Sequence, residues 1–265
     1  MSNWERFEIE CTNYLNYNFS RYAVFTHKGG SDSQEPDILV ETKKGKIFYI
    51  DVKYLPAQCG QFVLLPNFEF KKFEYSSKNA IKINIYSEKI IEHLNNNFYE
   101  FSVAGTTGKD IIMPNEKDIF SNWIIKTYQE KNVQFFITND FRIFDVKNIK
   151  DDFLINGKYR TKKSGSSSVG KKYIQSILEY VKSKYTVHNF TIDEDKLFII
   201  SSEKLDKIKF FLDNTEYMFS LRSINKFEIR KLSKTHNSNV IFSIKQKTDK
   251  TGIGDIKFID YIEKL

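Results

Sequence analysis

The sequence predicts a mixed α/β fold, in which a mixed sheet is flanked by helices and followed by a C-terminal α+β part. One observation is that stretches with helical periodicity alternate with short β-branched and aromatic runs along the 265 residues. The other is a content of 40% hydrophobic and 15% aromatic residues, which is ample for a packed interior. The expected helices are residues 3–16, 87–94, 118–128 and 173–185, and the expected strands are residues 22–26, 38–40, 47–50, 62–65, 80–86, 134–138, 197–200, 227–229 and 240–244.

The first expected helix carries an acidic residue on its apolar side. Trp4, Cys11 and Leu15 share one face of residues 3–16 at helical spacing, and Glu8 falls on the same face. A carboxylate there must reach solvent or meet a partner. Glu8 is therefore either a site residue or a helix-edge glutamate paired with a surface base.

A β-hairpin is expected between residues 35 and 62. The apolar segments 38–40 and 47–50 flank the polar run 43–46, where Gly45 suits a turn position with positive φ. Asp37 opens the first strand after Pro36. Asp51 and Lys53 close the second strand and share one face, because Val52 between them points to the other. In the polar loop 28–34 before the hairpin, Asp32 is a second-ranked alternative to Asp37 as a cation ligand.

The residues at the end of this hairpin suit the chemistry of a phosphate. Two carboxylates supply hard oxygen ligands for Mg²⁺, and a nearby ammonium can orient or help deprotonate a water that attacks phosphorus. An acid two residues before a lysine also occurs elsewhere, and Asp145/Lys147 is the most serious competitor because an apolar run leads into it. Only Asp51/Lys53 follows a strand that is itself preceded, one hairpin away, by Pro-Asp. The alternative is a surface hairpin with ordinary charges at its ends.

Pro36-Asp37 followed by Asp51-Val52-Lys53, in a strand–turn–strand context, resembles the PD-(D/E)xK nucleases over roughly the first sixty residues. The resemblance implies a restriction-endonuclease-like core and Mg²⁺-dependent phosphodiester hydrolysis. It also implies that Asp37, Asp51 and the Val52 carbonyl hold the metal, that Lys53 positions the attacking water, and that Glu8 of Phe7-Glu8 lies beside the site. Some members carry a glutamine with an aromatic residue four positions later, a spacing that Gln58 and Phe62 match; Gln58 and Gln61 are therefore possible site residues, or simply polar surface.

Positive charge is concentrated after residue 110. The net charge is +7, yet residues 1–110 hold 13 Lys and Arg against 14 Asp and Glu, and residues 111–265 hold 28 against 20. Such a distribution suits an enzyme that acts on a polyanion, although many lysine-rich chains are merely soluble. We therefore expect a catalytic core in residues 1–150 and a basic DNA-binding, target-recognition region in residues 151–265.

Two stretches of the basic region are candidates for contact with double-stranded DNA. Residues 157–172 look like a loop that contacts phosphates through lysine, arginine and serine, or a flexible Gly/Ser linker. Residues 230–239 carry donors of the types that reach base edges, or form an ordinary polar hairpin loop. The candidate DNA-binding residues are Lys158, Arg160, Lys162, Lys163, Ser164, Arg230, Lys231 and Asn237.

Other classes of function find little support. Two cysteines and four scattered histidines make neither a disulfide framework nor a zinc site, and no G-x-S-x-G or phosphate-binding glycine loop occurs. No run approaches eighteen apolar residues and the N-terminus lacks a basic-then-apolar signal pattern, so we expect no membrane insertion and a cytoplasmic location.

Three functions remain. The favoured one is a type II restriction endonuclease, which cuts double-stranded DNA at a specific site; the resemblance further implies a homodimer and a cognate methyltransferase as functional partner. The second is a structure-selective nuclease such as a Holliday-junction resolvase. The third is a non-catalytic nucleic-acid-binding module that keeps the fold, against which the intact Asp37, Asp51 and Lys53 argue.

Overall fold

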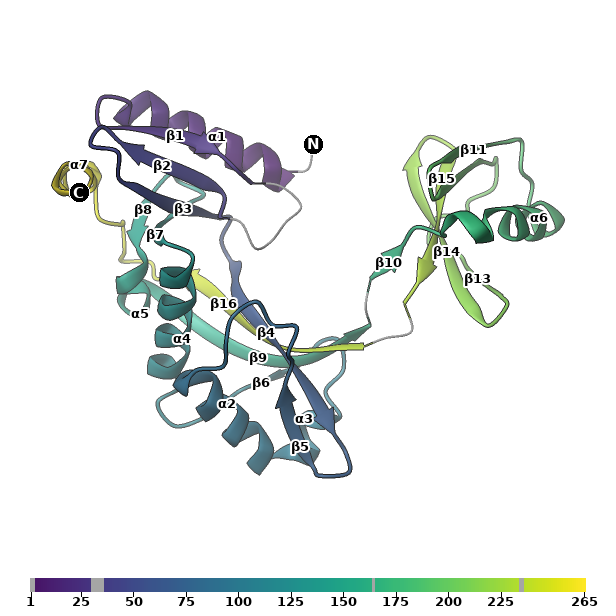
Figure 1. The fold of residues 1–265 in the computed structure, drawn as a ribbon, viewed down its shortest axis with the longest axis horizontal. Helices are drawn as coiled ribbons and strands as arrows, with labels where there is room; N and C mark the ends of the chain where they lie inside the picture. Colours follow the sequence, from purple (N-terminus) through teal and green to yellow (C-terminus); the bar gives the residue numbers. More distant parts are fainter. Residues whose placement is uncertain (1–2, 30–35, 164, 234–235) are drawn as a thin grey trace. The chain divides into compact units, whose positions relative to one another are not determined.

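A computed structural model describes residues 3–29, 36–163, 165–233 and 236–265, and it divides into two compact units (Figure 1). The core unit comprises Met1–Thr161 and Ser238–Leu265, and the inserted unit comprises Lys162–Asn237. These compact units differ from the expected division into residues 1–150 and 151–265. The reason is that the last segment of the chain returns to the core unit, where β16 completes the second sheet and α7 packs on the first.

The first sheet of the core unit is mixed, as predicted. Its strand order is β1 (Ala23–His27), β2 (Ile38–Thr42), β3 (Ile47–Lys53), β7 (Val133–Thr138) and β8 (Ile143–Asp145). β3 and β7 are parallel, whereas the other neighbours are antiparallel. Gly45 adopts φ +77° in the tight turn between β2 and β3, which is the conformation for which glycine was expected.

Helices cover one face of this sheet. α1 (Asn3–Phe19) and α7 (Asp255–Lys264) share a hydrophobic core with β1, β2, β3 and β7. The buried stripe of α1 runs through Phe7, Cys11, Leu15 and Phe19. Trp4 was expected on this stripe but is 50% exposed, because the stripe begins one turn later, at Phe7. Glu8, at 8% exposure, lies on the buried side as predicted.

The second sheet has the order β5 (Lys72–Tyr75), β4 (Ala57–Asn67), β16 (His236–Gln246), β9 (Phe153–Lys163) and β6 (Lys109–Asp110) (Figure 1). A large aromatic core joins it to α2 (Ile85–Asn96), α3 (Phe98–Ser102), α4 (Glu116–Glu130), η1 (Val146–Asn148) and α5 (Ile149–Asp152). Phe136 and Phe144 of the first sheet also reach this core. β7 is therefore buried on both faces, which explains its continuous apolar sequence.

The strand expected over residues 80–86 is wrong. Residues 80–84 are irregular and residues 85–86 already belong to α2, with Asn84 as the helix N-cap. The Asn84 side chain accepts hydrogen bonds from the backbone N of Tyr86 (3.0 Å) and of Ser87 (3.2 Å). The Ser87 hydroxyl reciprocates by accepting from the Asn84 backbone N at 2.8 Å, which completes a capping box. Alternation of Ile81, Ile83 and Ile85 imitates a strand, yet Ile83 and Ile85 are exposed.

The inserted unit is a small α+β structure. Its sheet has the order β11 (Asn189–Asp193), β12 (Lys196–Ile200), β15 (Lys226–Leu232), β14 (Thr215–Ser223) and β13 (Lys209–Leu212), and β10 (Ser166–Ser167) pairs with β15. The 3₁₀ turn η2 (Lys171–Tyr173) precedes α6 (Ile174–Lys184). The buried side of α6, formed by Ile174, Ile177, Leu178 and Val181, packs on Leu197, Ile199 and Phe219 of the sheet.

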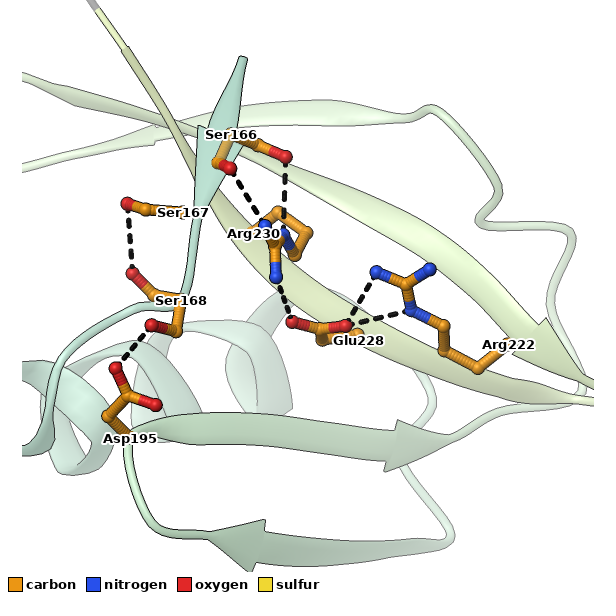
Figure 2. Close-up of polar contacts among 7 residues, drawn as sticks. All are labelled: Ser166, Ser167, Ser168, Asp195, Arg222, Glu228 and Arg230. Atoms are coloured by element: carbon orange, nitrogen blue, oxygen red, sulfur yellow. Dashed lines mark hydrogen bonds and ion pairs between the residues drawn. The ribbon is translucent and has the colours of Figure 1, made fainter. Parts of the chain in front are cut away.

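A buried ionic network ties strands of the inserted unit together (Figure 2). Glu228 is 4% exposed and accepts hydrogen bonds from Arg222 Nε at 2.8 Å and from Arg230 Nη1 at 2.6 Å. Arg230 also donates to the backbone carbonyl of Ser166 at 2.7 Å, which secures β10 against β15. Burial opposes ionisation of Glu228, but the hydrogen bonds from both arginines outweigh it and lower its pKa.

Replacing Glu228 by glutamine is expected to destabilise the protein by about 2–4 kcal/mol, because Arg230 would lose its charged partner in a largely buried place. The difference in unfolding free energy between wild type and variant should be largest at neutral pH and shrink as the pH falls. A carboxyl with a lowered pKa stabilises the fold at pH values above its ordinary pKa and loses that effect when it is protonated. Urea unfolding followed by circular dichroism measures it. Glu179→Gln, at an exposed glutamate on α6, is the control; equal midpoints for the two variants would contradict the role of Glu228.

Candidate active site

Strand pairing brings the two aspartates of the hairpin together. β2 and β3 are antiparallel with Ile38 opposite Ile50, so Asp37, just before β2, faces Asp51 near the end of β3. The backbone N of Val52 donates to Asp37 Oδ2 at 2.7 Å, which fixes the first carboxylate beside the second strand. The predicted cluster therefore exists, and the pairing of the two strands holds it.

Lys53 lies beside both carboxylates. Its ammonium forms an ion pair with Asp51 Oδ2, and the side chains of Lys53 and Asp51 are only 11% and 13% exposed. Burial opposes ionisation of each partner, but the attraction between them prevails: the pKa of Asp51 is lowered and that of Lys53 is raised. The pair is therefore charged at neutral pH.

Asp37 differs from Asp51 in its ionisation. Burial, together with the negative charge of Asp51, raises the pKa of Asp37 to about 8, although Lys53 and the Val52 N–H act in the opposite direction. One ammonium thus does not compensate two buried carboxylates. The chemistry of this donor set fits a divalent cation, which would supply the missing positive charge through hard oxygen ligands.

Two carboxylates are what the described residues offer to such a cation. Within the described ranges, no group of three or more His, Cys, Asp and Glu side chains is arranged to hold a metal ion. Asp32, the second-ranked ligand, lies outside the described residues. Mg²⁺ commonly takes one or two carboxylates and fills its other positions with water and phosphate oxygens, so Asp37 and Asp51 are sufficient protein ligands.

A pocket of about 510 Å³ opens over the cluster. Besides Asp37, Asp51 and Lys53, the predicted site residues Glu8, Val52, Gln58 and Gln61 line it. Glu8 Oε2 lies 2.9 Å from His27 Nε2, so its partner is a histidine rather than a surface base. A Cβ at Gly29 would lie 2.1 Å from Glu8 Oε2, so the backbone passes close to the Glu8 carboxylate.

The two glutamines belong to the exposed side of β4. Gln58 Nε2 donates to Gln61 Oε1 at 3.2 Å, and Asn239 Nδ2 of β16 donates to the same oxygen at 3.2 Å. Phe62, the aromatic residue in the suggested spacing, is buried in the second core. Both amides therefore line the pocket, whereas Phe62 packs in the hydrophobic core.

Sequence reasoning missed several residues around the pocket, of which Tyr128 is the best placed. The sequence predicts only a helix that ends at Tyr128, yet the ring centroid of Tyr128 lies 5.4 Å from Lys53 Nζ and its hydroxyl is among the groups that lower the pKa of Asp51. Thr127, Lys131 and Lys78 also line the pocket. The helical periodicity of α4 places Tyr128 on the buried side with Trp123 and Ile124, but no sequence signal pairs it with β3.

The competing motif at Asp145 has a local explanation. Asp145 Oδ1 accepts a hydrogen bond from the Lys147 backbone N at 2.8 Å and so caps the 3₁₀ turn η1. Asp145 is not among the residues that line the pocket of Asp37 and Asp51. Its carboxylate serves secondary structure rather than a site.

The predicted DNA-binding residues fall in both units. Residues 157–163 are not a loop, because they belong to β9. Lys158 Nζ lies 3.4 Å from Asp110 Oδ1, and Arg160 is half-buried. Ser164 and the side chains of Lys162, Lys163 and Asn237 lie outside the described residues.

Arg230 and Lys231 lie on β15 rather than in a loop. Arg230 is engaged with Glu228 and Ser166 (Figure 2), and Lys231 Nζ lies 5.5 Å from the ring of Tyr173. Arg230 would have to leave its internal partners to reach a base edge. The inserted unit as a whole is basic, with 15 Lys and Arg against 9 Asp and Glu, and so carries six of the seven net positive charges of the chain.

Comparison with known proteins gives one full-length similarity. The structure is similar to a solved structure of HhaI endonuclease in complex with DNA, with a TM-score of 0.82 and 34% sequence identity over 100% of both chains. No protein-family model matches the sequence, and no curated protein matches it. No helix within the described ranges has the length and apolar character needed to cross a membrane.

Asp37→Asn is expected to stabilise the metal-free protein, because asparagine can still accept the Val52 N–H but carries no charge beside Asp51. Because the pKa of Asp37 is raised, the stability of the wild-type protein falls as the pH rises from about 4 to about 8. The stability of Asp37→Asn relative to wild type should therefore grow over this range, to about 1 kcal/mol or more. Urea unfolding in EDTA at pH 5 and pH 8 measures it. Asp140→Asn, at an exposed aspartate, should change stability by less than about 0.5 kcal/mol. An Asp37→Asn variant no more stable than wild type at pH 8 would contradict the repulsion.

Proposed function

This chain belongs to the type II restriction endonucleases, the family of the HhaI enzyme, and we propose that it hydrolyses double-stranded DNA at the Asp37–Asp51–Lys53 cluster. The observation that carries the proposal is the coincidence of a full-length likeness at 34% identity with two buried carboxylates and a lysine at the base of one pocket. The likeness supports DNA as substrate, and the cluster supports phosphodiester hydrolysis as the reaction.

Asp37 and Asp51 would hold a divalent cation, which we propose to be Mg²⁺, with the Val52 carbonyl as a further oxygen ligand. When bound, Mg²⁺ supplies positive charge to the scissile phosphate and favours deprotonation of the attacking water. Asp37, which carries a proton at neutral pH in the metal-free protein, would release it as the cation binds. The Val52 N–H keeps the Asp37 carboxylate oriented during this change.

Lys53 has a separate role. Its ammonium stays charged in the pocket because the negative charge of Asp51 balances it. An ammonium has three N–H donors, and the ion pair with Asp51 does not use all of them. The remaining donors can hold the attacking water or a non-bridging phosphate oxygen in line for displacement. Glu8, supported by His27, is proposed to orient a second water at the same pocket.

Binding of the DNA backbone is assigned to the basic residues. The inserted unit carries most of the net positive charge, which suits contacts with phosphates. Lys162 and Lys163, at the end of β9, are proposed to take part in these contacts, and Lys158 and Arg160 of the same strand to add contacts from the core unit. Lys231 and Asn237 remain candidates for contact with bases, whereas Arg230 is proposed to contact DNA only if it exchanges its internal partners.

The remaining partners follow from the family resemblance and stay predictions. The described part of each chain contains one Asp–Asp–Lys cluster, so a homodimer would provide one cluster for each strand of the duplex. A restriction enzyme also needs a methyltransferase that protects the same sequence in the host, and both would act on DNA in the cytoplasm. Sedimentation of the protein with and without a cleavable duplex tests the dimer.

Asp51→Ala is expected to abolish cleavage, with at least about a 10³-fold loss of rate, because it removes a metal ligand and the partner of Lys53 together. Binding of duplex DNA should change by less than about threefold, since phosphate contacts come from elsewhere. Single-turnover cleavage and a binding titration measure the two effects. Asp145→Ala, at the acid of the competing motif, should cut at the wild-type rate. Retained cleavage by Asp51→Ala would show that the site is assigned wrongly.

A double variant, Lys162→Ala with Lys163→Ala, is expected to weaken DNA binding and to reduce the slope of log affinity against log salt by about 2, because two phosphate contacts are lost. Fluorescence anisotropy between about 50 and 200 mM salt measures the slope. Lys46→Ala, at the hairpin turn opposite the carboxylate end, is the control and should leave the slope unchanged. An unaltered slope in the double variant would place the phosphate contacts elsewhere.

A further inference from the structure

Tyr128 of α4 lies beside the ion pair of Asp51 and Lys53. Its side chain is 7% exposed, its ring centroid lies 5.4 Å from Lys53 Nζ, and its hydroxyl acts on Asp51, where it helps to lower the pKa of that carboxyl. Phe136 of β7 lies 5.6 Å from the same Nζ, and the two rings meet almost perpendicularly, at 82° with centroids 4.9 Å apart. The ammonium thus sits between a carboxylate and two aromatic faces, where cation–π attraction is favourable.

The direction of the hydrogen bonds around Tyr128 can be assigned. Asp51 is ionised beside Lys53 and can only accept, so the Tyr128 hydroxyl donates to it. Behind the hydroxyl, the Cys59 thiol donates to the Tyr128 oxygen, with Sγ at 3.7 Å. Cys59 is fully buried, and burial raises the pKa of its thiol to about 12, so it keeps its hydrogen. The order of donation is therefore Cys59 to Tyr128 to Asp51.

The helix that carries Tyr128 is firmly held. Trp123 and Ile124 of α4 are fully buried in the second core, and the Trp123 ring lies 4.6 Å from that of Phe242 on β16. A hydroxyl presented from such a packed helix has a fixed position relative to the sheet. Asp51, in contrast, lies near the end of β3 at an open pocket, where two competing demands act on its carboxylate and one on Lys53.

Those demands arise from the proposed function, on which this inference rests. Asp51 must offer an oxygen to a cation and at the same time balance Lys53, while Lys53 must turn its donors toward the substrate. We propose that Tyr128 is a positioning residue, which holds the Asp51 carboxylate by a hydrogen bond and the Lys53 ammonium by its ring, so that both stay in register during the reaction. Neither group of Tyr128 needs to touch the DNA.

Tyr128→Phe tests the proposal because it keeps the ring and removes only the hydroxyl. We expect the single-turnover cleavage rate at saturating Mg²⁺ to fall by about tenfold or more, a typical cost for loss of a supporting hydrogen bond at a metal site. The Mg²⁺ concentration for half-maximal rate should rise, whereas the Kd for duplex DNA, measured with Ca²⁺ in place of Mg²⁺, should stay within about twofold of wild type. A purely structural defect would not separate rate from DNA binding in this way.

Tyr75→Phe is the matched control. Tyr75 lines the same pocket, but its hydroxyl donates to the backbone carbonyl of Ile81 at 2.8 Å and not to Asp51. It should cut within about twofold of the wild-type rate. Thermal unfolding of both variants, recorded under the assay conditions, gives the folded fraction by which each rate is divided.

The outcomes distinguish the inference from the proposed function. A wild-type protein that cuts DNA, an inactive Lys53→Ala variant and a slow Tyr128→Phe variant with normal DNA affinity support both. A Tyr128→Phe variant that cuts within twofold of wild type, or no more slowly than Tyr75→Phe, overturns the role of Tyr128 alone. A Lys53→Ala variant as active as wild type would overturn the proposed site instead.

Discussion

The pairing of β2 with β3 is the constraint on which the site depends. Because Ile38 lies opposite Ile50, the strands bring Asp37 against Asp51 in the lining of one pocket. Lys53 compensates Asp51, and Asp37 is left with a raised pKa. A fold that spends stability on two facing carboxylates has an arrangement ready for a cation, which is how perturbed pKa values come to mark functional sites.

The rest of the core unit keeps that pairing in place. β3 is central in the first sheet, between β2 and the parallel strand β7, and the chain continues from its end into β4 of the second sheet. α4 packs against β4 of the second sheet and β7 of the first, so this one helix supports the aromatic core and also brings Tyr128 to the pocket. β16 and α7 return from the end of the sequence to complete the second sheet and to cover the first. The inserted unit therefore interrupts a structure that needs both of its chain segments.

The sequence was most informative where the signals are local. Gly45 between two apolar segments, Pro36 before Asp37 and the alternation around Val52 all act within a few residues, so the hairpin and the clustering of its three candidate residues could be predicted. Glu8 could be placed on the buried side by helical spacing, but its partner His27 could not be named. Tyr128 could not be linked to Asp51 because that contact depends on how α4 packs against the sheet.

Other differences between expectation and structure have physical causes of the same kind. Arg230 was expected in a polar loop, but it lies on β15, where its guanidinium is paired with Glu228, buried two residues away on the same strand. Residues 80–86 alternate like a strand, but the capping box at Asn84 starts a helix there. The compact units do not follow the change in composition along the chain, because compactness depends on β16 returning to pair with β4.

The central claim is that the hairpin cluster cuts DNA, and digestion of long unmethylated DNA by the purified protein with Mg²⁺, beside Lys53→Ala, tests it most directly. The account predicts discrete fragments from the wild-type protein and intact DNA from the variant, although both bind the duplex. Intact DNA in both lanes, or the same fragments in both, would contradict it; in the first case a four-way junction is the substrate to offer next.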